Sequence, residues 1–216
     1  DATPVQWLDG EAALSAIQVT GSGTRFHVSA GGLESTMSVG LIGAHQPRNA
    51  MCAWLALRAA GRPYDVPLAE VGPVLETLTL PGRFQRMGNL IFDVAHNTAG
   101  AAVLAETVKS VAPRRPITVL LAVLGDKDWR GMLSHLSGIA DRVVVSMPPT
   151  APSDRRWKLQ EVREFAARNR LPVEPIEDFD DALHSATNAG GTTLITGSFH
   201  TVGDAMLRLQ VNPLAR

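Results

Sequence analysis

The sequence predicts an α/β protein: a mostly parallel, Rossmann-like sheet with helices on both faces, preceded by a β-meander and two helices. Two observations predict this fold. From about residue 90 onward, short apolar segments alternate with amphipathic helical segments. These apolar segments are continuous, which is typical of strands that helices cover on both faces of a parallel sheet.

The first 40 residues instead predict a meander of strands. Gly21-Ser22-Gly23 and Gly31-Gly32 break this region, as turn residues do between strands. Within it, pairs of apolar residues alternate with small or polar ones: Ile17 and Val19, Phe26 and Val28, Met37 and Val39. A helix is expected over residues 49–60, where apolar side chains recur at helical spacing until Gly61.

A second short helix is expected over residues 67–77, although Gly72 and Pro73 weaken it. Leu80-Pro81-Gly82 then has the composition of a linker. After it, strands are expected at residues 90–94, 117–124, 142–146, 172–176 and 193–196. Helices are expected between and after them at residues 99–111, 129–136, 159–169, 180–188 and 202–209.

Several of these strands end in polar or glycine residues: Asp93, Gly125-Asp126, Ser146 and Gly197-Ser198. The carboxyl ends of parallel strands meet at one edge of the sheet, where open α/β folds bind their ligands. The sequence therefore predicts a binding site at that edge.

Composition narrows the classes of partner. The chain has 216 residues and a net charge of −1, with acids and bases interspersed, which argues against nucleic-acid and membrane-surface partners. It has no apolar run long enough to span a bilayer and no visible signal peptide. Cys52 is the only cysteine, so we expect a reducing, cytoplasmic setting. The chain starts at Asp1 rather than Met, which favours a piece of a longer protein.

Five motifs carry a family resemblance: His45-Gln46-x-x-Asn49-Ala50, Pro81-Gly82-Arg83-Phe84, Asp93-x-x-His96-Asn97, Gly125-Asp126-Lys127-Asp128 and Gly197-Ser198-Phe199-His200-Thr201-Val202. In this order they resemble the C-terminal part of the dihydrofolate synthase/folylpolyglutamate synthase branch of the Mur ligase family. The resemblance spans roughly residues 40–210.

The resemblance implies ATP- and Mg²⁺-dependent ligation of L-glutamate to dihydropteroate or folate through an acyl phosphate. Such chemistry needs a phosphate-binding loop, G-x-x-x-x-G-K-[ST], and none is found; Gly21-Ser22-Gly23-Thr24 lacks the lysine. In the family this loop and the magnesium ligands lie N-terminal to where this chain begins. Residues 1–80 then correspond to the end of the ATPase domain and residues 81–216 to the glutamate-ligase domain.

The resemblance also implies a partner and an activity state. The partner is the chain's own N-terminal ATPase domain, in an enzyme that is a monomer when full length. This chain alone is expected to be inactive, because the groups that position the phosphate are missing from it.

The nucleotide residues implied by the family are Asn49, Arg83 and Asp93. A guanidinium suits phosphate oxygens through paired hydrogen bonds; the alternative for Arg83 is a surface salt bridge in a linker. Asp93 suits ribose hydroxyls or a metal-bound water, and its alternative is a helix N-cap. Asn49 would approach the adenine, or would only cap the helix that it begins.

His96 is the catalytic candidate, near glutamate and the acyl phosphate, and Ser198 is the second candidate for binding glutamate. The alternative for Ser198 is a cap of the last helix. The chain departs from the family pattern at Thr98, where proline is usual, which questions the rigidity of this loop. A solvated charged turn is the alternative for Asp126, Lys127 and Asp128 and the preferred interpretation for Lys127 alone. His200 is interpreted as structural.

Two competing interpretations stay open. A cell-wall Mur ligase would share the fold, although the Gly125 and Gly197 motifs resemble the folate branch more closely. A non-catalytic nucleotide- or partner-binding module would explain the missing phosphate loop. The four tryptophans, Trp7, Trp54, Trp129 and Trp157, are too scattered in the sequence to predict a stacking platform.

Overall fold

The computed structural model describes residue 5 and residues 7–214. The first four residues, which the sequence included in the meander region, lie outside the described part. The chain divides into two compact units, residues 1–79 and residues 80–216, named unit 1 and unit 2 below. Each unit is described by itself.

Unit 1 contains the predicted meander. Strands β1 (Ala12–Thr20), β2 (Gly23–Ala30) and β3 (Leu33–Val39) pair antiparallel in the order β1-β2-β3. Gly31 and Gly32 form the second turn with φ of 58° and 78°, values that side chains disfavour. A four-residue helix, α1 (Leu8–Glu11), precedes the sheet and was not predicted, because one turn is too short for helical periodicity.

Two helices cover this sheet. Helix α2 (Gln46–Ala60) begins three residues before the predicted start, with a proline in its first turn, and ends at Gly61 as expected. Helix α3 (Leu68–Glu76) forms despite the glycine and proline inside it. One core joins the sheet to both helices of unit 1 through buried side chains such as Phe26, Val28, Met51, Trp54 and Leu68.

Unit 2 is built on a six-stranded sheet of order β4-β5-β9-β6-β7-β8. The strands are β4 (Gln85–Met87), β5 (Leu90–Asp93), β6 (Ile117–Leu121), β7 (Arg142–Val145), β8 (Val173–Pro175) and β9 (Thr192–Thr196). All pairings are parallel except that of β4 with β5. The unpredicted β4 has only three residues and turns into β5 at Gly88, which has a φ of 62°.

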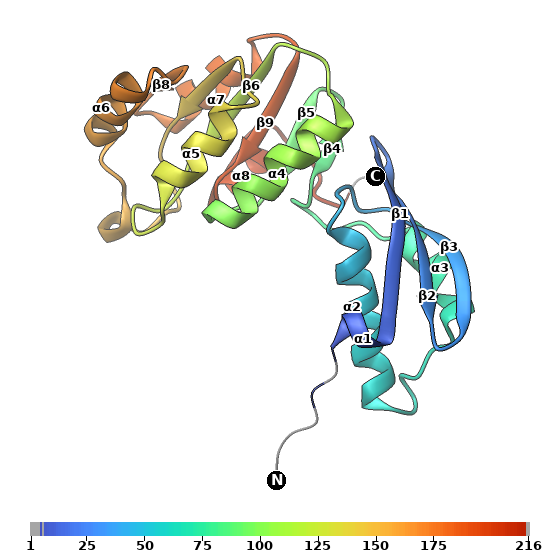
Figure 1. Ribbon diagram of the computed structural model, residues 1–216. Helices are drawn as coiled ribbons and strands as arrows, with labels where there is room; N and C mark the ends of the chain where they lie inside the picture. The colour runs from blue at the N-terminus through green and yellow to red at the C-terminus, as the bar shows by residue number, and fades with distance from the viewer. Residues whose placement is uncertain (1–4, 6, 215–216) are drawn as a thin grey trace. The chain divides into compact units, whose positions relative to one another are not determined.

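The helices of unit 2 are α4 (Thr98–Val111), α5 (Trp129–Ser137), α6 (Leu159–Asn169), α7 (Phe179–Thr187) and α8 (Phe199–Arg208). The chain runs outward from β5 to β8 through α4, α5 and α6, then returns to the centre at β9. Right-handed crossovers therefore place α4 to α6 on one face and α7 on the other. Figure 1 shows α4 and α5 side by side on the same face of the sheet.

The second face is covered by α7 and α8. Their buried side chains, among them Phe179, Ala182, Val202 and Ala205, pack against one side of the sheet formed by Phe92, Leu120, Val144 and Ile195. The prediction of a parallel sheet with helices on both faces is confirmed.

Besides the unpredicted β4, several features of unit 2 differ from the prediction. Strand β6, expected over residues 117–124, ends at Leu121. Helix α8 begins at Phe199 rather than at Val202, because Ser198 caps it. Trp129 and Trp157, far apart in the sequence, lie together with ring centroids 5.9 Å apart. Both indoles are buried, so this pair packs α5 against the segment before α6 and offers no exposed stacking surface.

Candidate functional site

The carboxyl edge of the unit 2 sheet brings together the ends of three strands. Asp93 at the end of β5 lies beside Thr196 at the end of β9, which lies beside Leu121 at the end of β6. The loops that follow contain three of the motifs that the sequence singled out. The convergence predicted from the strand ends is therefore present in the fold.

The carboxylate of Asp93 joins its own motif to the Pro81-Gly82-Arg83-Phe84 motif before β4. Oδ2 accepts the backbone N–H of Phe84 and Oδ1 accepts the backbone N–H of Ala95, both at 2.9 Å. Burial raises the pKa of Asp93, while these two hydrogen bonds and the nearby charge of Arg83 oppose the rise. Asp93 is not a helix cap: Asn97 caps α4, and its Oδ1 accepts the N–H of Gly100 at 2.7 Å.

The Gly82-Arg83-Phe84 turn is tight around Val94. The N–H of Val94 donates to the carbonyl of Gly82 at 2.9 Å. Gly82 has a φ of 67°, and a Cβ there would lie 2.7 Å from Val94 Cγ1, so only glycine fits. Phe84 also adopts a left-handed φ, of 48°. This turn presents the exposed side chain of Arg83 at the sheet edge.

The surface salt bridge considered for Arg83 does not form within the described part of the chain, where no carboxylate pairs with its guanidinium. Instead Cζ of Arg83 lies 5.9 Å from the ring centroid of Phe199. Phe199 is a residue that the sequence did not single out for function. An exposed phenylalanine at a helix start gives no pattern by which to recognise it.

His96 lies in the exposed loop between β5 and α4. Its Nδ1 is 3.1 Å from the carbonyl oxygen of Val94. A carbonyl only accepts, so Nδ1 carries the hydrogen and Nε2 is the nitrogen left for a ligand. The imidazole also lies beside Phe199, with the two ring centroids 6.3 Å apart.

Ser198 caps α8, as its alternative interpretation had it. Its Oγ accepts the N–H of Thr201 at 3.0 Å and lies 2.8 Å from Thr201 Oγ1. The hydroxyl of Thr201 in turn donates to the carbonyl of Ala122, which ties α8 to the end of β6. The Ser198 side chain is buried, so the groups that α8 offers to a ligand here are backbone amides of its first turn.

Asn49 belongs to unit 1 and does not cap a helix. It lies inside the first turn of α2, whose N-cap is His45, and its Nδ2 donates to Gln46 Oε1 at 3.2 Å. The cap interpretation is wrong because α2 begins at Gln46, three residues earlier, and Pro47 in its first turn has no backbone N–H that would need an acceptor.

Asp126 and Asp128, for which a solvated turn was the alternative interpretation, hold that turn to its neighbours. Asp128 caps α5 by accepting the N–H of Gly131 at 3.0 Å, and also accepts the hydroxyl of Thr98 at 2.8 Å. The Gly131 amide first, and then the Thr98 hydroxyl, lower the pKa of Asp128. Asp126 pairs with Arg155 at 2.6 Å, which lowers the pKa of Asp126.

Thr98 therefore links the first turn of α4 to that of α5. This hydrogen bond is made at the position where the absence of proline had questioned the rigidity of the loop before α4. The cap by Asp128 was not predicted; the signal that could have found it is an aspartate, a preferred N-cap residue, directly before the helix expected from Trp129.

The family model described as Mur ligase, glutamate ligase domain, matches residues 82–199, more than half of the chain. The chain belongs to the Mur ligase family. The matched range contains Arg83, Asp93, His96 and Ser198, and leaves Asn49 outside.

Relatives within the Mur ligase family agree on one branch. Dihydrofolate synthase/folylpolyglutamate synthase of Mycobacterium tuberculosis is 35% identical over 91% of this chain and 45% of its own length. The Escherichia coli protein of the same name is 31% identical over 73% of this chain and 37% of its own length. The chain thus spans less than half the length of these relatives.

Solved structures support the same fold. Mycobacterium tuberculosis folylpolyglutamate synthase complexed with ADP matches 95% of this chain and 49% of its own, with a TM-score of 0.81 and 31% identity. Thermotoga maritima folylpolyglutamate synthase matches with a TM-score of 0.72 and 26% identity over 94% of this chain and 47% of its own.

The magnesium expected for this Mur ligase chemistry has no ligand set in the described residues, since no three His, Cys, Asp or Glu side chains there could hold a metal ion together. The described helices include none that is long and apolar enough to cross a membrane.

Proposed function

We propose that this chain is the glutamate-binding half of an enzyme that ligates L-glutamate to dihydropteroate or folate with ATP. Two findings support the proposal. The relatives of this chain are named dihydrofolate synthase/folylpolyglutamate synthase, and the family model of the glutamate ligase domain matches residues 82–199. Residues 1–79 would complete the ATPase domain of the same enzyme, which is the partner of unit 2. Mg²⁺ would be held by that domain, so no step through the metal is assigned to residues of this chain.

The observation that carries the proposal is the hydrogen bonding of Asp93. By accepting the N–H groups of Phe84 and Ala95, it fixes the turn of Arg83 against the loop of His96. A guanidinium, an imidazole and the amides of a helix N-terminus then share one sheet edge. All three are groups that bind phosphates and carboxylates.

In the proposed reaction a carboxylate oxygen of the acceptor attacks the γ-phosphorus of ATP, which forms an acyl phosphate, and ADP leaves. The amine of glutamate then attacks the carbonyl carbon of the acyl phosphate, inorganic phosphate leaves, and the nitrogen loses a proton. Arg83 would bind the nucleotide phosphates, with Asp93 holding its turn, and Asn49 would approach the adenine. His96 would bind glutamate beside the acyl phosphate.

Ser198 contributes to the glutamate site in this proposal by shaping it. Its hydroxyl is committed to Thr201, but the cap that it makes holds the first turn of α8 so that backbone amides face the sheet edge. A substrate carboxylate bound there would gain from these amides and from the helix dipole.

The test is an acceptor and amino-acid exchange with the natural full-length protein. We expect release of inorganic phosphate from ATP only when L-glutamate and either dihydropteroate or tetrahydrofolate are both present. L-Alanine and D-glutamate, supplied with a UDP-linked muramoyl acceptor, are the comparison for the cell-wall branch. Turnover with the muramoyl acceptor and one of these amino acids, but not with L-glutamate and dihydropteroate or tetrahydrofolate, would contradict the proposal. Nucleotide binding without turnover on any pair would favour the non-catalytic module.

A further inference from the structure

Phe199 is an exception among the phenylalanines of this chain. Its side chain is 62% exposed, whereas Phe84 and Phe179 are 2% and 3% exposed. Phe26 and Phe92 are fully buried. An exposed aromatic ring gains little from hydrophobic burial, so core packing does not explain its presence at the start of α8.

The ring contacts the two exposed polar side chains of the candidate site. The guanidinium carbon of Arg83 lies 5.9 Å from its centroid, within the range of a cation–π interaction. The imidazole of His96 has its centroid 6.3 Å away, with the two ring planes tilted by 37°. One ring thus lies beside a side chain from the turn before β4 and a side chain from the loop after β5.

The backbone that carries Phe199 is held firmly. Ser198 caps the helix at this point, and Thr201 ties its first turn to Ala122. Gly197, with a φ of 122°, lies so close to the Ala122 carbonyl that a Cβ would be 2.2 Å from its oxygen. Arg83, in contrast, has a long side chain with no ion pair in the described residues and therefore has much rotamer freedom to lose on binding.

We propose that Phe199 is a positioning residue that holds two side chains at the sheet edge: the Arg83 guanidinium toward the nucleotide phosphates and the His96 imidazole toward glutamate. It does so without contacting the substrate itself. By ordering Arg83 before binding, it reduces the entropy lost when phosphate is bound. This inference rests on the proposed function, because it takes Arg83 as a phosphate ligand. An aliphatic residue of similar size would fill the space but would not attract the guanidinium.

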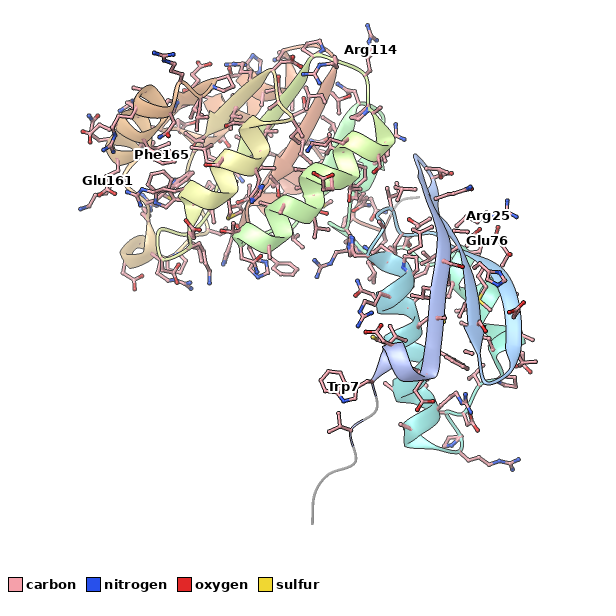
Figure 2. All side chains as sticks on the ribbon, in the orientation of Figure 1. Trp7, Arg25, Glu76, Arg114, Glu161 and Phe165 are labelled. Atoms are coloured by element: carbon pink, nitrogen blue, oxygen red, sulfur yellow. The ribbon has the colours of Figure 1, made fainter. Side chains whose placement is uncertain are left out.

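The first experiment measures the mobility of Arg83 directly, without any ligand. In the 216-residue chain, the ¹⁵Nε order parameter of Arg83 should fall on Phe199→Leu and stay near the wild-type value on Phe199→Tyr. Phe165→Leu is the matched control, because Phe165 (labelled on α6 in Figure 2) lies 6.0 Å from Cζ of another arginine, Arg130. It should leave Arg83 unchanged. Equal mobility of Arg83 in the wild type and Phe199→Leu would overturn the proposal.

The second experiment is a double-mutant cycle on ADP affinity in the natural full-length protein. Phe199→Leu should weaken ADP binding roughly two- to fivefold, which is the size of an exposed cation–π interaction. It should have no effect in an Arg83→Ala background, since its action passes through the guanidinium. A structural role would weaken binding equally in both backgrounds, and that result would overturn the proposal.

The two proposals fail in different ways. If Arg83→Ala leaves ADP affinity unchanged, or the wild type binds no ADP, the nucleotide role of this edge fails and the mobility measurement alone decides on Phe199. If Arg83→Ala weakens ADP binding and Phe199→Leu does not, only the positioning role is lost.

Discussion

The carboxylate of Asp93 accepts the backbone N–H of Phe84 at 2.9 Å, although nine residues and a β-hairpin separate them in the chain. The same side chain accepts the N–H of Ala95 at 2.9 Å. Two sequence motifs, Gly-Arg-Phe and Asp-x-x-His, are therefore parts of one hydrogen-bonded structure. The conformation of the Arg83 turn depends on the residue that ends β5.

Asp93→Ala should lower the free energy of unfolding by about 1–3 kcal/mol, because it leaves two partly buried N–H groups without their acceptor. Urea denaturation of the 216-residue chain measures it. The pH dependence gives a second readout, since the pKa of Asp93 is raised.

A carboxyl with a raised pKa binds more protons in the folded state than in the unfolded state. Its contribution makes the protein less stable as the pH rises from the ordinary aspartate value of about 3.9 through the raised folded value. The variant should lack this component of the pH dependence. If the stability–pH curves of the wild type and Asp93→Ala are parallel, the pKa of Asp93 is not raised by folding, contrary to this account.

Ser198→Ala should cost about 1 kcal/mol of stability, the usual value of a lost N-cap. Ser198→Asp is the matched comparison, because aspartate also caps helices, and it should recover much of the stability. In the full-length enzyme, Ser198→Ala should raise the KM for glutamate more than that for ATP, through a loosened α8 terminus. Equal changes in both KM values would assign Ser198 to folding alone.

Thr98→Val should raise the pKa of Asp128 toward the ordinary aspartate value, because it removes one of the two hydrogen bonds that lower it. A carboxyl whose pKa is lowered by folding stabilises the folded state at pH values above its unfolded-state pKa. This contribution is lost as the pH falls through the folded-state pKa. A ¹³C titration of the carboxyl groups measures the shift. Asp126, whose pKa is lowered by Arg155, is the internal control and should not move.

The isolated chain should release no phosphate with ATP, glutamate and dihydropteroate. Positioning of the γ-phosphate supplies most of the catalysis in phosphoryl transfer, and the loop that does so in the family was not found in this sequence. Turnover by the 216-residue chain at the rate of the natural full-length protein would overturn the proposal that this chain is one half of an enzyme and is inactive alone.

Much of unit 2 was predictable because its strands are continuous apolar segments and its helices are amphipathic. Both patterns are local properties of the sequence. The start of α8 was misplaced by three residues because Phe199 and His200 break the apolar period, while the cap at Ser198 decides the boundary. The short strand β4 has too few residues to show alternation and forms only because β5 is there to pair with it.

The site residues were predictable as motifs, but not the contacts between them. Nothing local in the sequence indicates that the Asp93 side chain would accept the Phe84 amide, or that Phe199 would lie beside both Arg83 and His96. The contact of Trp129 with Trp157 was missed for the same reason. The contacts of Phe199 depend on the order in which the strands lie in the sheet, because this order brings β9, which precedes Phe199, between β5 and β6.

The central claim is that one sheet edge serves ATP through Arg83 and glutamate through His96. Both side chains are exposed, so their alanine variants should fold normally, and Arg114→Ala is a control. Arg114 is also exposed but extends from the loop before β6, at the opposite end of the strands, as Figure 2 shows.

The most direct test is to measure both KM values in the full-length enzyme for Arg83→Ala and His96→Ala. Arg83→Ala should raise the KM for ATP about ten- to a hundredfold, the size of a lost charged hydrogen bond, with a smaller effect on glutamate. His96→Ala should show the reverse pattern. If each variant changes both KM values by the same factor, or neither changes them, the edge is not the shared site of nucleotide and glutamate.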